Sequence, residues 1–187
     1  QSKVAMLFWQ QSLYGSADVV LTPKPIHGPG DQLIQDCYSK PADLYARLAA
    51  GESTLTPGQP RGPFNLMHYW GPMAGIGSSR WIADVARYVY DTRRPSLTLV
   101  YLPHLDYNLQ RLGPADPAIA ADLRAIDEVA GELIAHVRRD GARVVVLSEY
   151  GIGPVRGVVH INRALRQAGL VRVRVELGLE KLDAGAS

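Results

Sequence analysis

The run Leu-Thr-Leu-Val-Tyr-Leu at residues 97–102 and the run Arg-Val-Val-Val-Leu-Ser at residues 143–148 decide the fold. Each is short and almost wholly apolar, a pattern typical of a strand that is covered on both faces of a sheet. Strand, helix and strand of these lengths predict a βαβ unit with parallel strands and a right-handed crossover. The helix between the runs has apolar residues at alternating steps of four and three positions: Ile119, Leu123, Ile126, Ala130, Leu133 and Val137.

The ends of this helix are also marked in the sequence. Asp116 is placed to cap its beginning, and Pro117 stands at the first helical position, where the missing backbone N–H has no intrahelical partner to lose. Gly141 is placed to end it, because glycine readily adopts the left-handed conformation that closes many helices. The second apolar run therefore starts directly after the helix.

Weaker patterns extend the prediction on both sides of this unit. Residues 26–32 and 51–63 are rich in glycine and proline and predict loops, the second a flexible surface loop. Ser78 or Ser79 is expected to cap a helix at residues 78–91. Together the elements predict an α/β fold, a three-layer α/β/α sandwich around a mostly parallel sheet. The other expected strands are 3–9, 18–21, 64–68 and 171–175, and the other expected helices are 41–50 and 161–167.

The bulk composition is that of an ordinary globular protein. Of 187 residues, 47% are hydrophobic and 20% charged, and the formal net charge of +2 argues against a nucleic-acid partner. The single cysteine, Cys37, excludes a disulfide within the chain and a zinc site built of cysteines, and it fits a reducing compartment such as the cytoplasm. No apolar run reaches the ~18 residues that a membrane span needs, and no signal peptide is visible.

Polar side chains follow both apolar runs at the point where each predicted strand ends. The first run leads into His104 and Asp106, and the second into Glu149 and Tyr150. Ligands of open α/β sheets bind beyond the carboxyl ends of the strands, so these four side chains are expected together at a site. Two carboxylates there suit a divalent cation, which prefers hard oxygen ligands. The alternative is that these residues cap loops and helices, and the residues alone do not decide between the two.

The residues after the first run resemble a metal-binding motif of the type I phosphodiesterase/nucleotide pyrophosphatase family, within the alkaline phosphatase superfamily. That motif reads Asp-x-x-Gly-His-x-x-Gly-Pro, and its Asp and His bind one metal ion. Asp106, Gly113 and Pro114 match it at the same spacing, while Leu109 and Gln110 replace the Gly and the ligand His. One of the two ligands of this motif is therefore changed.

The second run also ends as in the family, where Ser-Asp-His-Gly-Met carries the ligands of the other metal ion. Here the residues are Ser148, Glu149, Tyr150, Gly151 and Ile152, so that a longer carboxylate replaces Asp and a phenol replaces His. Gly-Pro-Val at 153–155, Ile-Asn-Arg-Ala-Leu at 161–165 and Ala-Gly-Leu at 168–170 are similar to the family as well. The resemblance is best over residues 97–170.

The resemblance implies that residues 1–187 are part of one alkaline-phosphatase-like domain whose activity is metal-dependent hydrolysis of a phosphate ester or nucleotide. It implies metal ligands at Asp106, Gln110, Glu149 and Tyr150. The family metal is zinc. With oxygen-bearing residues at both histidine positions, three outcomes stay open for the whole protein: a harder cation, weakly bound zinc, or no metal. The Thr or Ser nucleophile of the family has no counterpart here. The chain is therefore expected to be an internal piece of a longer protein, inactive by itself.

Two other functions are compatible with the altered motifs. The replacement of both histidines favours a degenerate superfamily member that binds a phosphorylated or other ligand without hydrolysing it. A third interpretation keeps catalysis but changes the reaction, for example to phosphate-group isomerisation or sulfate ester hydrolysis. Because two-metal hydrolysis needs its metal ions in place, the metal content of the whole protein separates the first two functions.

Three further side chains are candidates for substrate contact. His104 shares a face with Asp106 if the strand stays extended there, Arg111 suits a phosphate oxygen, and His160 precedes a predicted helix. The alternatives are a hydrogen bond to a loop for His104, a solvated side chain for Arg111 and a capping or packing role for His160. A glycine-rich turn at residues 75–80 also opens a helix, where backbone N–H groups can bind phosphate, although most such turns are only caps.

Overall fold

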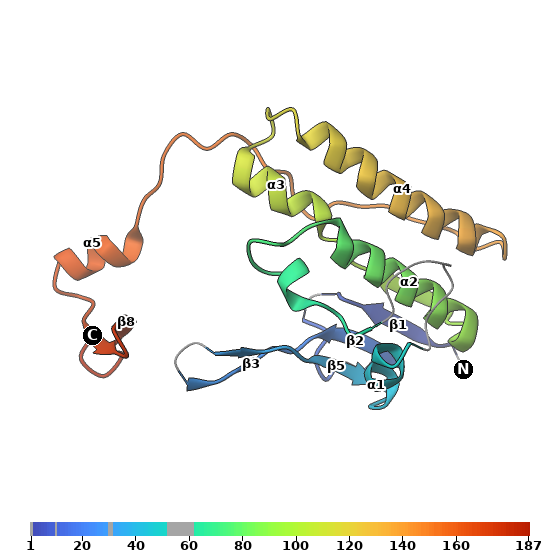
Figure 1. Ribbon diagram of the computed structural model, residues 1–187, viewed down its shortest axis with the longest axis horizontal. Coiled ribbons are helices and arrows are strands. Elements are labelled where there is room, and N and C mark those ends of the chain that lie inside the picture. Colours follow the sequence, from blue (N-terminus) through green and yellow to red (C-terminus); the bar gives the residue numbers. More distant parts are fainter. Residues whose placement is uncertain (1, 10, 30–31, 52–61) are drawn as a thin grey trace. The chain divides into compact units, whose positions relative to one another are not determined.

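The computed structural model describes residues 2–9, 11–29, 32–51 and 62–187 (Figure 1). These residues form two compact units, one of Gln1–Ile26 with Gln35–Gly153 and the other of His27–Ile34 with Pro154–Ser187. The described residues include five α-helices, and the central sheet is mostly parallel. The fold is therefore mixed α/β, as the sequence predicts.

Four described strands form the sheet of the first unit, in the order β5 (Cys37–Lys40), β2 (Val19–Pro23), β1 (Val4–Leu7) and β6 (Leu97–Val100). β1 lies parallel to both β2 and β6, whereas β2 lies antiparallel to β5. The long connection from β2 to β6 passes through β5, helix α1 (Leu44–Ala49) and helix α2 (Ile76–Arg93). The three parallel strands end at the same edge of the sheet, where the candidate site lies.

The centre of this sheet is the best buried part of the chain. Leu7, Val20 and Leu21 have no exposed surface, and four consecutive residues of β2 are buried, so this strand is covered on both faces. β6 is the outer strand of the described sheet, and Leu97 is 51% exposed. The strand predicted at 97–102 is confirmed in its first part, but the cover on both of its faces is not found.

Helix α2 packs on β1 and β6. Its predicted apolar stripe is buried: Ile82, Val85, Ala86 and Val89. The helix begins two residues earlier than predicted, and its N-cap is Gly75 instead of Ser78 or Ser79. Both serines are buried in the first turns, and Ser78 Oγ donates to the Gly75 carbonyl at 3.0 Å.

Helix α4 (Ile119–Arg138) packs on α2 and on α3 (His104–Leu112), as Figure 1 shows. Ile126 and Val129 form a buried cluster with Ala83 of α2. Leu123 belongs to the predicted stripe but is 55% exposed, so only the middle of the stripe is covered.

Both ends of α4 are displaced from the predicted positions: its N-cap is Ala118 in place of Asp116, and its C-cap is Arg139 in place of Gly141. Asp116 accepts the Ala118 N–H at 2.9 Å and closes the turn before the helix. Gly141 has a φ of +78° and donates its N–H to the Arg138 carbonyl at 3.0 Å. The left-handed conformation at Gly141 turns the chain away from the helix axis.

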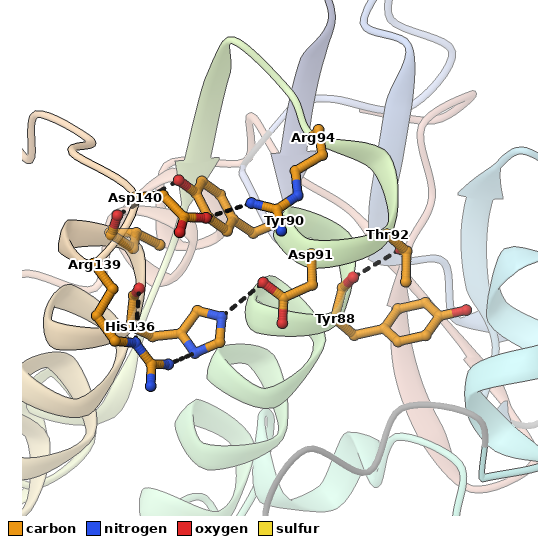
Figure 2. Close-up of polar contacts among 9 residues, drawn as sticks. Tyr88, Tyr90, Asp91, Thr92, Arg94, His136, Arg139 and Asp140 are labelled. Carbon is orange, nitrogen blue, oxygen red and sulfur yellow. Dashed lines mark hydrogen bonds and ion pairs between the residues drawn. The ribbon is translucent and has the colours of Figure 1, made fainter.

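Polar side chains join the C-terminal ends of α2 and α4 (Figure 2). His136 Nε2 lies 2.8 Å from Asp91 Oδ1, and Arg139 Nη2 lies 2.5 Å from His136 Nδ1. Because arginine only donates, Nδ1 of His136 accepts and Nε2 carries the hydrogen that Asp91 accepts. Arg94, which follows α2 with a φ of +48°, forms an ion pair with Asp140. This end of the helix pair is thus held by side chains that the sequence alone did not pair.

The second apolar run is not a strand. Residues 143–148 have no regular structure, and Val145, Val146 and Leu147 are 77%, 77% and 68% exposed. The predicted βαβ unit is therefore wrong in its last element. A strand needs a partner edge within hydrogen-bonding distance in addition to an apolar sequence, and this run has none among the described residues. The strand predicted at 64–68 is also wrong, because Leu66–His68 form the 3-10 helix η2.

Other predictions for the first unit are confirmed or lie outside the described residues. Leu44 and Leu48 of α1 are buried, and α1 packs against β5. The predicted loop 51–63 falls almost wholly outside the described ranges. No described helix is long and apolar enough to span a membrane.

The second unit is built from local structure. Helix α5 (Ile161–Gln167) ends at Gly169, whose φ is +76°. β7 (Val173–Glu176) pairs antiparallel with β8 (Leu179–Leu182) through a two-residue turn in which Leu177 and Gly178 both have positive φ. The predicted helix and strand are confirmed, whereas β8 was not expected. The remaining strands, β3 (Ile26–His27) and β4 (Leu33–Ile34), pair with each other.

Candidate active site

The chain leaves β6 through Tyr101 and Pro103 and enters α3 at once, so the first predicted ligands lie on a helix. Asp106 and Gln110 are four positions apart and share one face of α3. His104 and Asp106 are two positions apart and lie about 200° apart around the helix axis. The shared face predicted for His104 and Asp106 required an extended strand and is therefore wrong.

Asp106 connects the two segments that the sequence placed at one site. Tyr150 Oη donates to Asp106 Oδ2 at 2.6 Å, and Tyr101 Oη donates to the same oxygen at 3.2 Å. Tyr101 follows β6, and Tyr150 follows the exposed run 143–148. The prediction that residues after the two apolar runs lie close together is thus confirmed for Asp106 and Tyr150, even though the second run is not a strand.

A pocket of about 360 Å³ opens beside Asp106. Its walls are largely aromatic, and its charged and amide side chains come from α3. The lining residues are Tyr69, Trp70, Gly71, Ala74, Tyr101, Pro103, Asp106, Tyr107, Gln110 and Arg111. Sequence reasoning identified Asp106, Gln110 and Arg111 but assigned no role in the site to Tyr101 or Tyr107. The sequence signal for Tyr107 was its position directly after Asp106.

The phenols around Asp106 are neutral at physiological pH. Burial raises the pKa of Tyr69 and of Tyr107 to about 12, and burial together with the Asp106 charge raises the pKa of Tyr101 as well. The hydrogen bond to Asp106 raises the pKa of Tyr150. Tyrosines in this state donate hydrogen bonds and carry no charge, so the formal charges of the pocket are those of Asp106 and Arg111.

Arg111 is held by the protein itself. Its Nη1 donates to the Pro72 carbonyl at 3.3 Å, and its Nη2 donates to the Ala74 carbonyl at 3.1 Å and to Asn108 Oδ1 at 2.8 Å. These bonds fix the loop before α2 to α3. The guanidinium therefore shapes one wall of the pocket with most of its donors already used.

His104 faces α4 and does not line the pocket. Its side chain is 6% exposed, and its Nε2 lies 3.4 Å from Asp122 Oδ1 without the geometry of a hydrogen bond. Asn108, one turn later, donates to the other oxygen of Asp122 at 2.6 Å. Burial lowers the pKa of His104, and the Asp122 carboxylate opposes this shift. Among the described residues, neither ring nitrogen of His104 has a hydrogen-bond partner.

The two remaining predicted residues lie apart from these contacts. Glu149 precedes Tyr150 and is exposed. His160 is the N-cap of α5 in the second unit and lines an open pocket with Val159, Ile161, Asn162 and Arg163. Asp106 and Gln110 thus line one pocket, and Tyr150 is hydrogen-bonded to Asp106. No group of three or more His, Cys, Asp or Glu side chains that could hold a metal ion occurs within the described ranges.

Comparison with known proteins decides the family. The family model "Type I phosphodiesterase / nucleotide pyrophosphatase" matches residues 1–186. The chain belongs to this family. An uncharacterized pyrophosphatase/phosphodiesterase of the fission yeast Schizosaccharomyces pombe is 32% identical to the chain over 68 residues, which cover 34% of this chain and 14% of the yeast protein. No solved structure matches the chain significantly.

Type I phosphodiesterases generally depend on divalent metal ions, so the donor atoms of the pocket are the test of fit. The pocket supplies oxygen atoms from Asp106 and Gln110, and no imidazole lines it among the described residues. The hydroxyls of Tyr101 and Tyr150 donate to Asp106. Oxygen donors suit a hard cation such as Mg²⁺ or Mn²⁺, whereas zinc sites usually contain nitrogen or sulfur ligands. The carboxylate of Asp106 and the amide oxygen of Gln110 therefore suit a hard divalent cation that keeps several of its waters.

Proposed function

We propose that the whole protein hydrolyses a phosphodiester or pyrophosphate bond in a nucleotide or another small phosphate ester, and that residues 1–187 are part of its alkaline-phosphatase-like domain. The observation that carries this proposal is the family match across residues 1–186. The meeting of Asp106 and Tyr150 at 2.6 Å supports it, because the two altered motifs of the family converge there.

In this proposal a divalent cation is held at Asp106 and Gln110, and Glu149 and Tyr150 complete the set of candidate ligand positions. The cation supplies positive charge that stabilises the developing charge on phosphate oxygens. Asp106 and Gln110 keep a fixed spacing because both project from one face of α3. The Thr or Ser nucleophile of the proposed reaction comes from outside residues 1–187.

The aromatic walls of the pocket suit the organic part of such a substrate. Tyr69, Trp70, Tyr101 and Tyr107 line it, and aromatic rings stack on bases without a strong sequence preference. Arg111 uses its donors on backbone carbonyls, and the pocket beside Asp106 offers no other cationic side chain among its lining residues. Contacts of His104, Arg111 and His160 with substrate remain predictions.

Hydrolysis of bis-p-nitrophenyl phosphate and of nucleotides by the whole protein tests the proposal. We expect activity that requires added Mg²⁺ or Mn²⁺ and falls at least about 100-fold in the Asp106→Ala variant, because that variant lacks the one carboxylate that lines the pocket. Thr98→Ala, a change in β6 outside the pocket-lining set, is the matched control. Cation-independent hydrolysis, or an unaffected Asp106→Ala variant, would contradict the proposal.

A second function has its own support. Tyr150 stands where the family has a ligand histidine, and its hydroxyl is hydrogen-bonded to Asp106. This contact favours a member that binds a phosphorylated or other ligand without hydrolysing it. Elemental analysis of the whole protein separates the two functions. A bound divalent metal that is lost in an Asp106→Ala, Glu149→Ala variant supports the hydrolase, and no metal even after incubation with excess cations supports the binding protein.

A further inference from the structure

One oxygen of Asp106 accepts two hydrogen bonds. Tyr150 Oη and Tyr101 Oη both donate to Oδ2, at 2.6 Å and 3.2 Å. A carboxylate oxygen has two lone-pair sites, so these two donors occupy both sites of Oδ2. No described residue donates to Oδ1 of the same carboxylate, although Asp106 lines the pocket.

We propose that Tyr101 and Tyr150 are positioning residues, which fix the carboxylate of Asp106 through Oδ2 and leave Oδ1 as its one ligand atom. The inference rests on the proposed cation at Asp106 and gives Tyr150 a different role from the ligand that its sequence position predicts. A cation at this site is then bound by a single oxygen of Asp106, because bidentate binding would require Oδ2 to lose one of its two hydrogen bonds from the tyrosine hydroxyls.

The origin of the two donors explains why the orientation is well fixed. Tyr101 comes from the end of β6, and Tyr150 comes from the segment that follows residues 143–148, so the carboxylate is held from two separate parts of the first unit. Asp106 itself is carried by α3. Hydrogen-bonding partners of ligating carboxylates set the direction of the ligand atom, and their removal typically lowers metal affinity about 10- to 100-fold.

The test is Mn²⁺ binding to the whole protein, followed by the electron paramagnetic resonance signal of free Mn²⁺. The variants are Tyr150→Phe, Tyr101→Phe, and Asp106→Asn, which removes the charge of the site. Tyr14→Phe is the matched control, because Tyr14 is 71% exposed and its hydroxyl accepts from Lys24 outside the pocket. Each Phe variant keeps its ring and loses one oxygen, and thermal unfolding curves establish that each variant is folded.

Tyr101→Phe is the deciding variant, because Tyr101 reaches the same oxygen as Tyr150 and is not at a ligand position of the family motifs. We expect both Tyr101→Phe and Tyr150→Phe to weaken Mn²⁺ binding about 10-fold, with unchanged stoichiometry, and Tyr14→Phe to bind normally. Weakening in Tyr150→Phe alone would overturn the inference and make Tyr150 a ligand. Unchanged or tighter binding in both Phe variants would also overturn it. If Asp106→Asn binds Mn²⁺ as tightly as the native protein, Asp106 does not hold a cation, and the proposed function fails as well.

Discussion

Two segments of the first unit are both wholly apolar and have opposite structures. β1 reads Val-Ala-Met-Leu at Val4–Leu7, and residues 144–147 read Val-Val-Val-Leu. β1 lies between two parallel strands with Leu7 fully buried, whereas Val145 to Leu147 are exposed and unpaired within the described sheet. The comparison shows that an apolar run identifies a segment whose burial would stabilise the fold. Whether the segment is buried depends on neighbouring strand edges and helices.

The strongest test of this comparison removes the same atoms from both segments. Leu7→Ala is expected to lower the free energy of unfolding by about 2–5 kcal/mol, because it opens a cavity at a fully buried position. Leu147→Ala, at a position 68% exposed, is expected to change it by less than about 0.5 kcal/mol. Urea unfolding followed by circular dichroism measures both. A cost for Leu147→Ala close to that of Leu7→Ala would show that residues 143–148 are buried in the protein in solution.

The contact between α3 and α4 gives the next largest effect, now for polar groups. Asp122→Ala leaves Asn108 without its acceptor and His104 without its nearby charge, at a site where His104 is buried. We expect a loss of about 1–3 kcal/mol in the free energy of unfolding. Asp127→Ala, at an exposed position of the same helix, is the control and should lie within about 0.5 kcal/mol of the native protein. Equal values for the two variants would mean that Asp122 does not join the helices.

A thiol probe sharpens the comparison between covered and uncovered segments. Cys37 in β5 is 7% exposed, and burial raises its pKa to about 12. Native Cys37 should therefore react with iodoacetamide at least about 100-fold more slowly at pH 8 than the thiol of Val146→Cys in a Cys37→Ala background, because thiolate is the reactive form. Similar rates at both positions would contradict the burial of Cys37.

The same shift makes the stability of the fold depend on alkaline pH. The pKa of Cys37 is higher in the folded state than its ordinary value of 9.0, so the unfolded thiol loses its proton first as the pH rises. The contribution of Cys37 to the free energy of unfolding is complete below pH 9 and declines between pH 9 and about 12. At pH 10 this decline is about 1 kcal/mol. Comparing the native protein with Cys37→Ala by urea unfolding at pH 8 and pH 10 isolates it. An identical pH dependence in both would contradict the prediction.

The smallest effect concerns the turn between β7 and β8 in the second unit. Leu177 has a φ of +51° and Gly178 a φ of +79°, which is the conformation of a two-residue hairpin turn that favours Asn-Gly. Leu177→Asn is expected to stabilise this hairpin by roughly 0.5 kcal/mol, because asparagine tolerates positive φ better than leucine. Amide hydrogen exchange of residues 173–182 measures the gain locally. Faster exchange in the variant would mean that the Leu177 side chain packs against a partner.

The sequence predicts elements well where periodicity and local signals agree. The apolar stripe of α2 is a local property and is confirmed. Gly141 has the left-handed conformation expected of it, although α4 already ends at Arg138. The failure at 143–148 comes from a property that is not local, namely the presence of a neighbouring strand edge. Helix α3 was not predicted, and the shared face of His104 and Asp106 held only if the strand continued past Pro103, which it does not.

The sequence named some of the residues around the candidate pocket and none of their contacts. Asp106, Gln110 and Tyr150 were named from two motifs; Asp106 and Gln110 line the pocket, and Tyr150 is hydrogen-bonded to Asp106. The role of Tyr101 depends on the distance between its hydroxyl and Asp106, which no sequence pattern encodes. The direction of the His104 side chain follows from helix α3, which was not predicted from the sequence.

The placement of Asp106 and Gln110 on one face of α3 has a consequence for how the site tolerates change in related proteins. Exchanging one donor atom type for another at either position leaves the backbone unchanged, so a single substitution can change which cation the pocket prefers. An insertion or deletion of one residue between them would rotate Gln110 by about 100° around the helix axis and take it out of the pocket. The geometry of the pocket therefore depends more on the interval of four residues than on the identity of the side chain at position 110.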